Sequence, residues 1–247
     1  MDKSRFFSAA EQTFSLNRLA FADDLRIKEI LFAATDIILE KNKVMNLTSI
    51  CTEEEFVARH WADALLAEKF IPRGASLLDV GTGAGILAIA YAAARPDITV
   101  LALDSTAKKT DFVAETAKTL GLGNLSAVSA RAEEFSRKES FRERFDFVCA
   151  RAVAALPVLT ELCLPLVKVG GVMCALKGKN GDEEISASAK GITLLGGKVS
   201  LDEKTELKEI TPDGVLSSDR HIIIIDKISK THDNFPRRYA QITKNPL

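Results

Sequence analysis

Three glycines, Gly81, Gly83 and Gly85, follow an apolar run in the stretch SLLDVGTGAGILAIAYAAARPDITVLALDS, residues 76–105, and Asp104 closes the next apolar run. Glycines between a strand and a helix let the backbone approach a ligand closely, while the first amides of the helix stay free to bind it. A carboxylate at the end of the second strand can accept hydrogen bonds from both ribose hydroxyls. The pattern therefore predicts a cofactor that contains a nucleoside.

The glycine spacing discriminates between cofactors. A dinucleotide fingerprint, G-x-G-x-x-G, would place its third glycine where this chain has Ile86. The observed pattern, D-x-G-x-G-x-G from Asp79, is typical of S-adenosylmethionine enzymes. In the alternative interpretation the glycines only make a tight turn, and Asp104 caps the next helix.

Two more polar segments follow predicted strands on the same edge of the sheet. In SARAEEF, Ala132 and Glu133 could meet an adenine, although Glu133 could also be a helix-start acid. In CARAVA, Arg151 would lie at the mouth of the cleft. There its cation could hold a methionine carboxylate, an RNA phosphate or a structural carboxylate.

The elements that must position these residues are short apolar runs alternating with helical segments. Runs this apolar suit parallel strands covered on both faces. We predict an α/β fold with a doubly wound, mostly parallel sheet, and an antiparallel pair formed by GGKVSLDEKTEL and RHIIIIDKI at its end. The expected strands are 76–80, 99–103, 125–129, 145–150 and 171–177, and the expected helices between them are 86–94, 108–120, 154–167 and 182–190.

Two helices are expected before the sheet. The apolar spacing predicts one over 22–41, and Thr52 with Glu55 has the spacing of a capping box that opens another, ending near residue 70. We therefore expect residues 1–71 to be a helical extension packed on the core, and residues 72–247 to be the cofactor-binding domain with a basic C-terminal tail.

The composition excludes several classes of protein. The net charge is −1, so no overall positive field points to a polyanionic partner, and a nucleic-acid face must be local. The four cysteines form no CxxC pair and there is no HExxH, so no metal is expected and the thiols are interpreted as buried and reduced. The chain starts without an apolar signal segment and has no long apolar run, which predicts a cytoplasmic protein without a membrane span.

Further segments, read together with the cofactor motifs, occur in one order along the chain. They are NLT (46–48), RHWADALL (59–66), DVGTGAG (79–85), LDS (103–105), RAEEF (131–135), ARA (150–152), LKGK (176–179), FPRR (235–238) and KNPL (244–247). With these segments the chain resembles, from about residue 42 to the end, the ribosomal RNA small subunit methyltransferase G family, also called glucose-inhibited division protein B. The departures are Ala64, Leu87, Ala88 and Ala240, which affect local packing and the tail.

The resemblance implies a Rossmann-like class I methyltransferase with a seven-stranded sheet, which transfers a methyl group from S-adenosylmethionine to N7 of one guanine in small-subunit ribosomal RNA. It implies an RNA substrate within an assembled or partly assembled subunit, and a monomeric enzyme. The cofactor residues would be Asp79, Gly81, Gly83, Ile86, Asp104, Ser105, Thr106, Ala132, Glu133 and Arg151. Substrate-positioning residues would be Asn46, His60, Arg151 and Lys177, with Asp63 in the same polar cleft, and the RNA contacts would be Arg59, Lys177, Lys179, Arg237, Arg238 and Lys244.

Guanine N7 already carries a lone pair, so this reaction needs alignment of the reacting atoms and no general base. Other interpretations remain open. His60 could be a histidine of the core, Arg59 and Asp63 could form an ion pair within a helix, and the basic tail could simply be solvated. A methyltransferase for a small molecule or a protein, or a nucleotide-binding regulator, would also suit the cofactor motif.

Overall fold

The computed structural model describes residues 1–50 and 52–247. Cys51, one of the four thiols discussed above, lies outside the described residues. The other three, Cys149, Cys163 and Cys174, are free and buried, as predicted.

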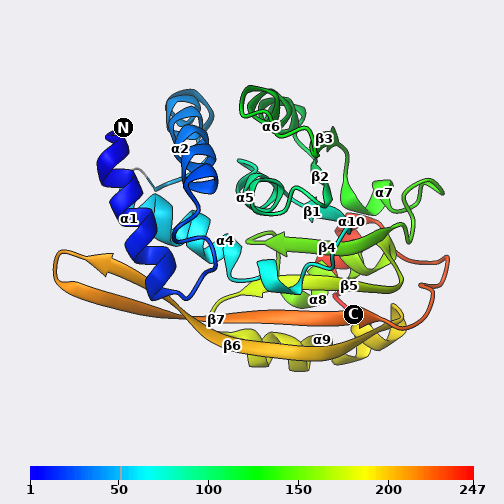
Figure 1. Cartoon of the computed structure of the whole chain (residues 1–247). Helices are drawn as coiled ribbons and strands as arrows, with labels where there is room; N and C mark the ends of the chain where they lie inside the picture. Colours follow the sequence, from blue (N-terminus) through cyan, green and yellow to red (C-terminus); the bar gives the residue numbers. More distant parts are fainter. Residues whose placement is uncertain (51) are drawn as a thin grey trace.

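The centre of the fold is a mixed sheet with the strand order β3-β2-β1-β4-β5-β7-β6, seven strands within the described residues (Figure 1). The first five strands are parallel, whereas β7 runs antiparallel to both of its neighbours. This confirms the predicted fold class. The strands are β1 (Ser76–Val80), β2 (Thr99–Asp104), β3 (Leu125–Ser129), β4 (Phe145–Arg151), β5 (Val167–Lys177), β6 (Gly197–Thr211) and β7 (Gly214–Lys227).

Helices cover both faces of the sheet (Figure 1). One hydrophobic cluster joins one sheet face to α1 (Lys3–Leu16), α2 (Leu25–Met45), α5 (Ile86–Ala94) and α6 (Ala107–Thr119), and the other joins the opposite face to α7 (Ala132–Phe135), α8 (Leu156–Cys163), α9 (Gly181–Leu194) and α10 (Tyr239–Lys244). The run of four isoleucines in β7 shows why the sequence folds this way. Ile222 and Ile224 belong to the first cluster, and Ile223 and Ile225 to the second, because alternate side chains of a strand point to opposite faces.

The helix expected to start at Thr52 and end near residue 70 lies where it was predicted, but it is not one regular α-helix. It consists of α3 (Glu53–Phe56), a π-helical turn η1 (Val57–Ala62), α4 (Asp63–Leu65) and, after a break, a 3-10 turn η2 (Glu68–Phe70). The side chain of Thr52 accepts a hydrogen bond from the amide of Glu55, so the predicted cap is present. A π-helical turn depends on packing and has no local sequence pattern.

Several element boundaries differ from the expectations. The helix predicted over 154–167 ends earlier: a 3-10 turn η3 (Leu164–Leu166) follows Cys163, and Val167 already pairs with Phe145 as the first residue of β5. Pro165 lacks an amide hydrogen and cannot continue the α-helical bonding. The terminal hairpin is longer than expected, since β6 and β7 pair from Gly197 to their turn at Thr211 and Gly214.

Helix α1 was not predicted at all. Its buried residues Phe6, Ala10 and Phe14 recur every four positions, which is a helical spacing that the sequence does contain. Together with α2 it packs on the segment that follows α3. The division of the chain at residue 71 remains a prediction.

A buried hydrogen bond fixes this packing. The indole nitrogen of Trp61, in η1, donates to the hydroxyl of Thr35, in α2, at 2.8 Å, and neither side chain is exposed. Indole has no other hydrogen-bonding atom, so loss of the hydroxyl would leave a buried donor without a partner.

We therefore expect Thr35→Val to lower the free energy of unfolding by about 1–3 kcal/mol, because the shape is kept and the acceptor is lost. Urea denaturation followed by circular dichroism measures this. The matched control is Thr119→Val, which removes an exposed hydroxyl bonded only to the carbonyl of Glu115 in its own helix. Equal stability of the two variants would contradict the role given to Thr35.

Candidate active site

A cavity of about 290 Å³ lies at the carboxyl ends of β1, β2, β3 and β4, the edge predicted from the sequence. Its walls come from four separate turns that parallel strands bring to one edge. Six of the predicted cofactor residues line it, namely Gly81, Asp104, Ser105, Thr106, Ala132 and Glu133.

A second cavity, of about 270 Å³, adjoins the first, since both are lined by Gly81, Lys109 and Ala152. The structure therefore brings all ten predicted cofactor residues to two neighbouring cavities. Those that line the second are Asp79, Gly81, Gly83, Ile86 and Arg151, joined by His60.

The glycine turn is required by its backbone and by its surroundings. Gly81, Gly83 and Gly85 have φ of 74°, 58° and 83°, in the left-handed region that side chains disfavour. A Cβ on Gly81 would also lie 2.5 Å from a methyl carbon of Val153. Glycine at position 81, which lines both cavities, thus leaves the space beside Val153 free of a side chain.

Asp104 holds the two turns beside it and is not the cap of α6, whose N-cap is Thr106 without a side-chain hydrogen bond. One carboxylate oxygen accepts the amide of Thr106 at 2.9 Å, which positions the turn before α6, and the other accepts the amide of Gly83 at 3.1 Å. The carboxylate lines the first cavity and is only 8% exposed. Each oxygen has a second lone pair, so the group can still accept hydrogen bonds from a ligand.

Asp79 is a buried carboxyl group that faces the second cavity. The hydroxyl of Thr82 donates to it at 2.7 Å. Burial raises the pKa of Asp79 to about 6, and the nearby Arg151 acts in the opposite direction. A cationic ligand group in this cavity would favour the ionised form.

His60 is neutral at physiological pH. Burial, and next the positive charge of Arg151, lower the pKa of His60 to about 4. Its Nε2 is hydrogen-bonded to the hydroxyl of Thr48 at 2.8 Å, and its ring contacts Phe56 edge to face. The ring thus lines the second cavity without carrying charge.

A third space, a crevice of about 230 Å³, adjoins the second cavity at Arg151 and Ala152. The carboxylate of Asp63 accepts from Arg151 at 2.8 Å and from Arg220 at 2.5 Å. Arg151 also donates to the carbonyls of Arg59 and His60 in the π-helical turn. Sequence reasoning missed Arg220, because only the register of β7 against β5 brings it to this edge.

The remaining predicted positioning residues differ in where they lie. Lys177 lines it, and its ammonium contacts Glu184 at 2.7 Å and the carbonyl of Ala154. Asn46 is an exposed residue with a left-handed backbone at the end of α2 and lines none of the three cavities. Lys179 is exposed two residues beyond Lys177.

Arg59 points elsewhere. It pairs with Glu209 at 2.9 Å and with Glu55 at 3.4 Å, beside a separate cavity between α1 and β6. The alternative ion pair with Asp63 is therefore not formed, because Asp63 is occupied by the two arginines of the crevice.

The basic C-terminal segment is packed on the domain. Arg237 forms a bidentate ion pair with Glu161, whose side chain is fully buried. Arg238 and Lys244 are exposed. Tyr239 lines the first cavity, where its ring lies 5.5 Å from the guanidinium carbon of Arg131.

The strand order, the glycine turn and the acid at the end of β2 together define the class of Rossmann-like methyltransferases. Solved structures agree on the fold: an O-methyltransferase from Bacillus cereus in complex with SAH has a TM-score of 0.52 at 17% identity, covering 87% of this chain and 99% of that one. A precorrin-6y C5,15-methyltransferase from Geobacter metallireducens has a TM-score of 0.52 at 16% identity, covering 67% of this chain and 87% of that one.

Sequence comparison defines the family. The model of rRNA small subunit methyltransferase G matches residues 28–210, and the chain belongs to this family. A relative of that name from Caldicellulosiruptor bescii is 42% identical over 228 residues, 90% of this chain and 93% of the relative. Another of that name, from Clostridium perfringens, is 37% identical over 247 residues, 98% and 99% of the two chains.

The lowered pKa of His60 predicts a pH-dependent stability. Between about pH 4 and 6.5 the unfolded chain binds a proton at this position that the folded chain does not, so stability is lost as the pH falls. The unfolding free energy of the wild type minus that of His60→Gln should therefore increase as the pH is raised from about 4 to 6.5, by up to about 3 kcal/mol.

Asp79 serves as a control because its pKa shift predicts the opposite dependence of stability on pH. Its pKa is raised, so the folded chain holds the extra proton, and the wild type minus Asp79→Asn difference should fall as the pH rises from about 4 to 6. Urea titrations at several pH values measure both differences. If both differences changed with pH in the same direction, the opposite pKa shifts of His60 and Asp79 would be contradicted.

Proposed function

We propose that the protein transfers a methyl group from S-adenosylmethionine to N7 of a guanine in 16S ribosomal RNA. Family membership supports the reaction class. The observation that carries the proposal is that two cavities lined by the predicted cofactor residues adjoin a crevice lined by three cationic side chains, Arg151, Lys177 and Arg220.

The cavities fit this cofactor by the chemistry of their walls. Asp104 can accept the ribose hydroxyls, and Tyr239 offers an aromatic face beside Ala132 and Glu133 for the adenine. Asp79 and Arg151 face the second cavity with charges opposite to the ammonium and the carboxylate of a methionine end. When bound, the cofactor supplies a methyl group on a sulfonium.

The protein's task is then to position a base. Guanine N7 attacks with its own lone pair, so no side chain has to remove a proton, and the neutral His60 suits this role. Arg151 and Lys177 would attract and orient the nucleotide at the crevice, and Asn46, at the end of α2, would contact the substrate from outside the cavities. Arg220 would join them, since it shares the carboxylate of Asp63 with Arg151.

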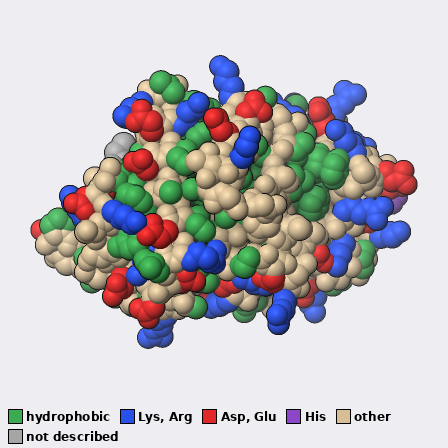
Figure 2. Space-filling model, turned by 45° about the horizontal axis from the view of Figure 1, so that its top comes forward, with side chains coloured by type: hydrophobic (Ala, Val, Ile, Leu, Met, Phe, Trp, Pro, Cys, Tyr) green, Lys and Arg blue, Asp and Glu red, His purple; other side chains and the backbone are tan. Residues whose placement is uncertain are grey.

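RNA contacts would be local. Figure 2 shows Lys and Arg side chains interspersed with Asp and Glu over the face it presents, without one continuous basic surface. Lys179, Arg238 and Lys244 are exposed and available to phosphates. Arg59 and Arg237 would have to exchange their carboxylate partners for phosphates.

The state of the RNA substrate, the oligomeric state and the cellular location are part of the same proposal. An RNA substrate in an assembled or partly assembled small subunit, a monomeric enzyme and a cytoplasmic location all suit this reaction. In the described residues, the helices are too short or too polar to cross a membrane. Residues 1–71 would act as a helical extension of the catalytic domain in residues 72–247.

Mass spectrometry of ribosomal RNA from cells with and without this protein tests the proposal. One 16S guanine should carry a methyl group on N7 only when the protein is present. Purified protein should restore the methyl group with S-adenosylmethionine, and ribonuclease treatment of the substrate should abolish turnover. Turnover that survives ribonuclease would favour a small-molecule or protein substrate instead.

Asp104→Asn tests the cofactor site. The amide oxygen can still accept the amide of Thr106, but the side-chain NH2 cannot accept the amide of Gly83, and the negative charge for the ribose hydroxyls is lost. Charge-assisted hydrogen bonds contribute roughly 1.5–3 kcal/mol, so the dissociation constant for S-adenosylmethionine should rise at least tenfold, about 1.4 kcal/mol. Titration calorimetry measures it.

The matched control is Asp111→Asn, an exposed acid of α6 outside the cavities. It should bind S-adenosylmethionine like the wild type. Unchanged binding in Asp104→Asn as well would place the ribose elsewhere.

A further inference from the structure

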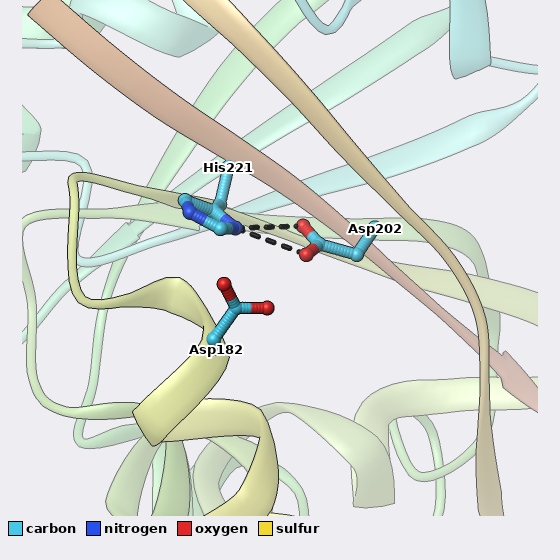
Figure 3. Close-up of side chains that lie close together, drawn as sticks. All are labelled: Asp182, Asp202 and His221. Carbon is cyan, nitrogen blue, oxygen red and sulfur yellow. Dashed lines mark hydrogen bonds and ion pairs between the residues drawn. The ribbon is translucent and has the colours of Figure 1, made fainter.

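A cluster of three potential ligands lies outside the methyl-transfer site. Asp182 comes from the first turn of α9, Asp202 from β6 and His221 from β7, and one ligand atom of each lies within 4.8 Å of the others (Figure 3). None of the three lines the cavities or the crevice described above. We propose that these side chains form a binding site for a divalent transition-metal ion of the zinc type.

The fold fixes the position of the imidazole. His221 is 6% exposed, and its ring packs on Gly181, where a Cβ would lie 2.1 Å from the ring. His221 is opposite Lys204 in the β6–β7 ladder, so Asp202, two residues from Lys204, is its diagonal neighbour on the same face. Two of the three ligands are therefore held by strand pairing.

The chemistry favours a metal with mixed nitrogen and oxygen preference. Nδ1 of His221 lies 3.0 Å from both carboxylate oxygens of Asp202, and because a carboxylate only accepts, Nδ1 carries the hydrogen. An ion bound at Nδ1 would displace this proton, and the neutral imidazole would then carry its single hydrogen on Nε2. One imidazole and two carboxylates suit Zn²⁺, whereas Mg²⁺ and Ca²⁺ prefer oxygen alone.

Asp182 completes the triangle from the side of the helix. In Figure 3 its carboxylate faces the space between His221 and Asp202. Its side chain is 64% exposed, which leaves coordination positions for water. The ammonium of Lys204 lies 2.7 Å from one oxygen of Asp182 and so competes with an ion for this ligand.

The site would add a second link between parts of the chain that the ion pair of Lys204 with Asp182 already joins. An ion would join the start of α9 to the β6–β7 hairpin and thereby restrain residues 178–180, which link Lys177 to α9 and include the exposed Lys179. The inference does not depend on the methyl-transfer function, because the reaction proposed above requires no metal.

Titration calorimetry with Zn²⁺ on the tag-free full-length protein tests the site. One saturable site per chain is expected, with affinity reduced at least tenfold in Asp182→Asn and in Asp202→Asn. Asp219→Asn and Glu183→Gln, which remove exposed acids beside the cluster, should bind like the wild type. Lys204→Gln should bind more tightly, because it frees Asp182.

Two controls keep the outcome clear. Circular dichroism of each variant excludes loss of folding as the cause of lost binding. Co²⁺ in place of Zn²⁺ should give visible absorption of a nitrogen and oxygen site, without the intense near-ultraviolet band of a cobalt thiolate. Equal affinities in all variants, a thiolate band, or no saturable binding by the wild type would overturn the proposal.

Discussion

The carboxylate of Asp63 joins the helical segment before the sheet to the sheet edge at the candidate active site. It belongs to the helical segment before the sheet and accepts hydrogen bonds from Arg151 at the end of β4 and from Arg220 in β7. Two guanidinium groups share one carboxylate, so a net positive charge remains at the crevice after the ion pairs have formed. Because removal of Asp63 would leave two partly buried cations without the carboxylate that they share, the helical segment and the sheet edge form a single structural unit.

The π-helical turn belongs to the same arrangement. In this turn the carbonyls of Arg59 and His60 accept hydrogen bonds from Arg151. In a regular α-helix these carbonyls would bond only to amides of the helix itself. The positive charge of Arg151 in turn contributes to the low pKa of His60. Helix irregularity and cation placement thus belong to one set of contacts, which adds to the larger effect of burial on the pKa of His60.

The sequence predicts those parts of the site that depend on neighbouring residues. The turn at Gly81 to Gly85 and the acid at 104 follow from local patterns, and parallel strands bring such turns to one edge whatever the details of packing. Arg220 and the cluster around His221 depend instead on the register of an antiparallel hairpin, which a run of four isoleucines, buried on both faces, does not specify. Composition likewise shows that the C-terminal segment is basic, but not that Arg237 is bound to Glu161, 76 residues earlier.

The length of β6 has a consequence for how the protein behaves at high concentration. This strand is the last of the sheet, and its edge offers unpaired backbone groups to any other extended chain except where the side-chain amide of Asn17 bonds both backbone groups of Lys208. Its side chains counter this: charges of both signs occur along it, at Lys198, Asp202, Glu203, Lys204, Glu206, Lys208 and Glu209. A second sheet that approached this edge would have to bring these charges into register with its own, so the edge discourages fibre-like association while the hairpin keeps its full length.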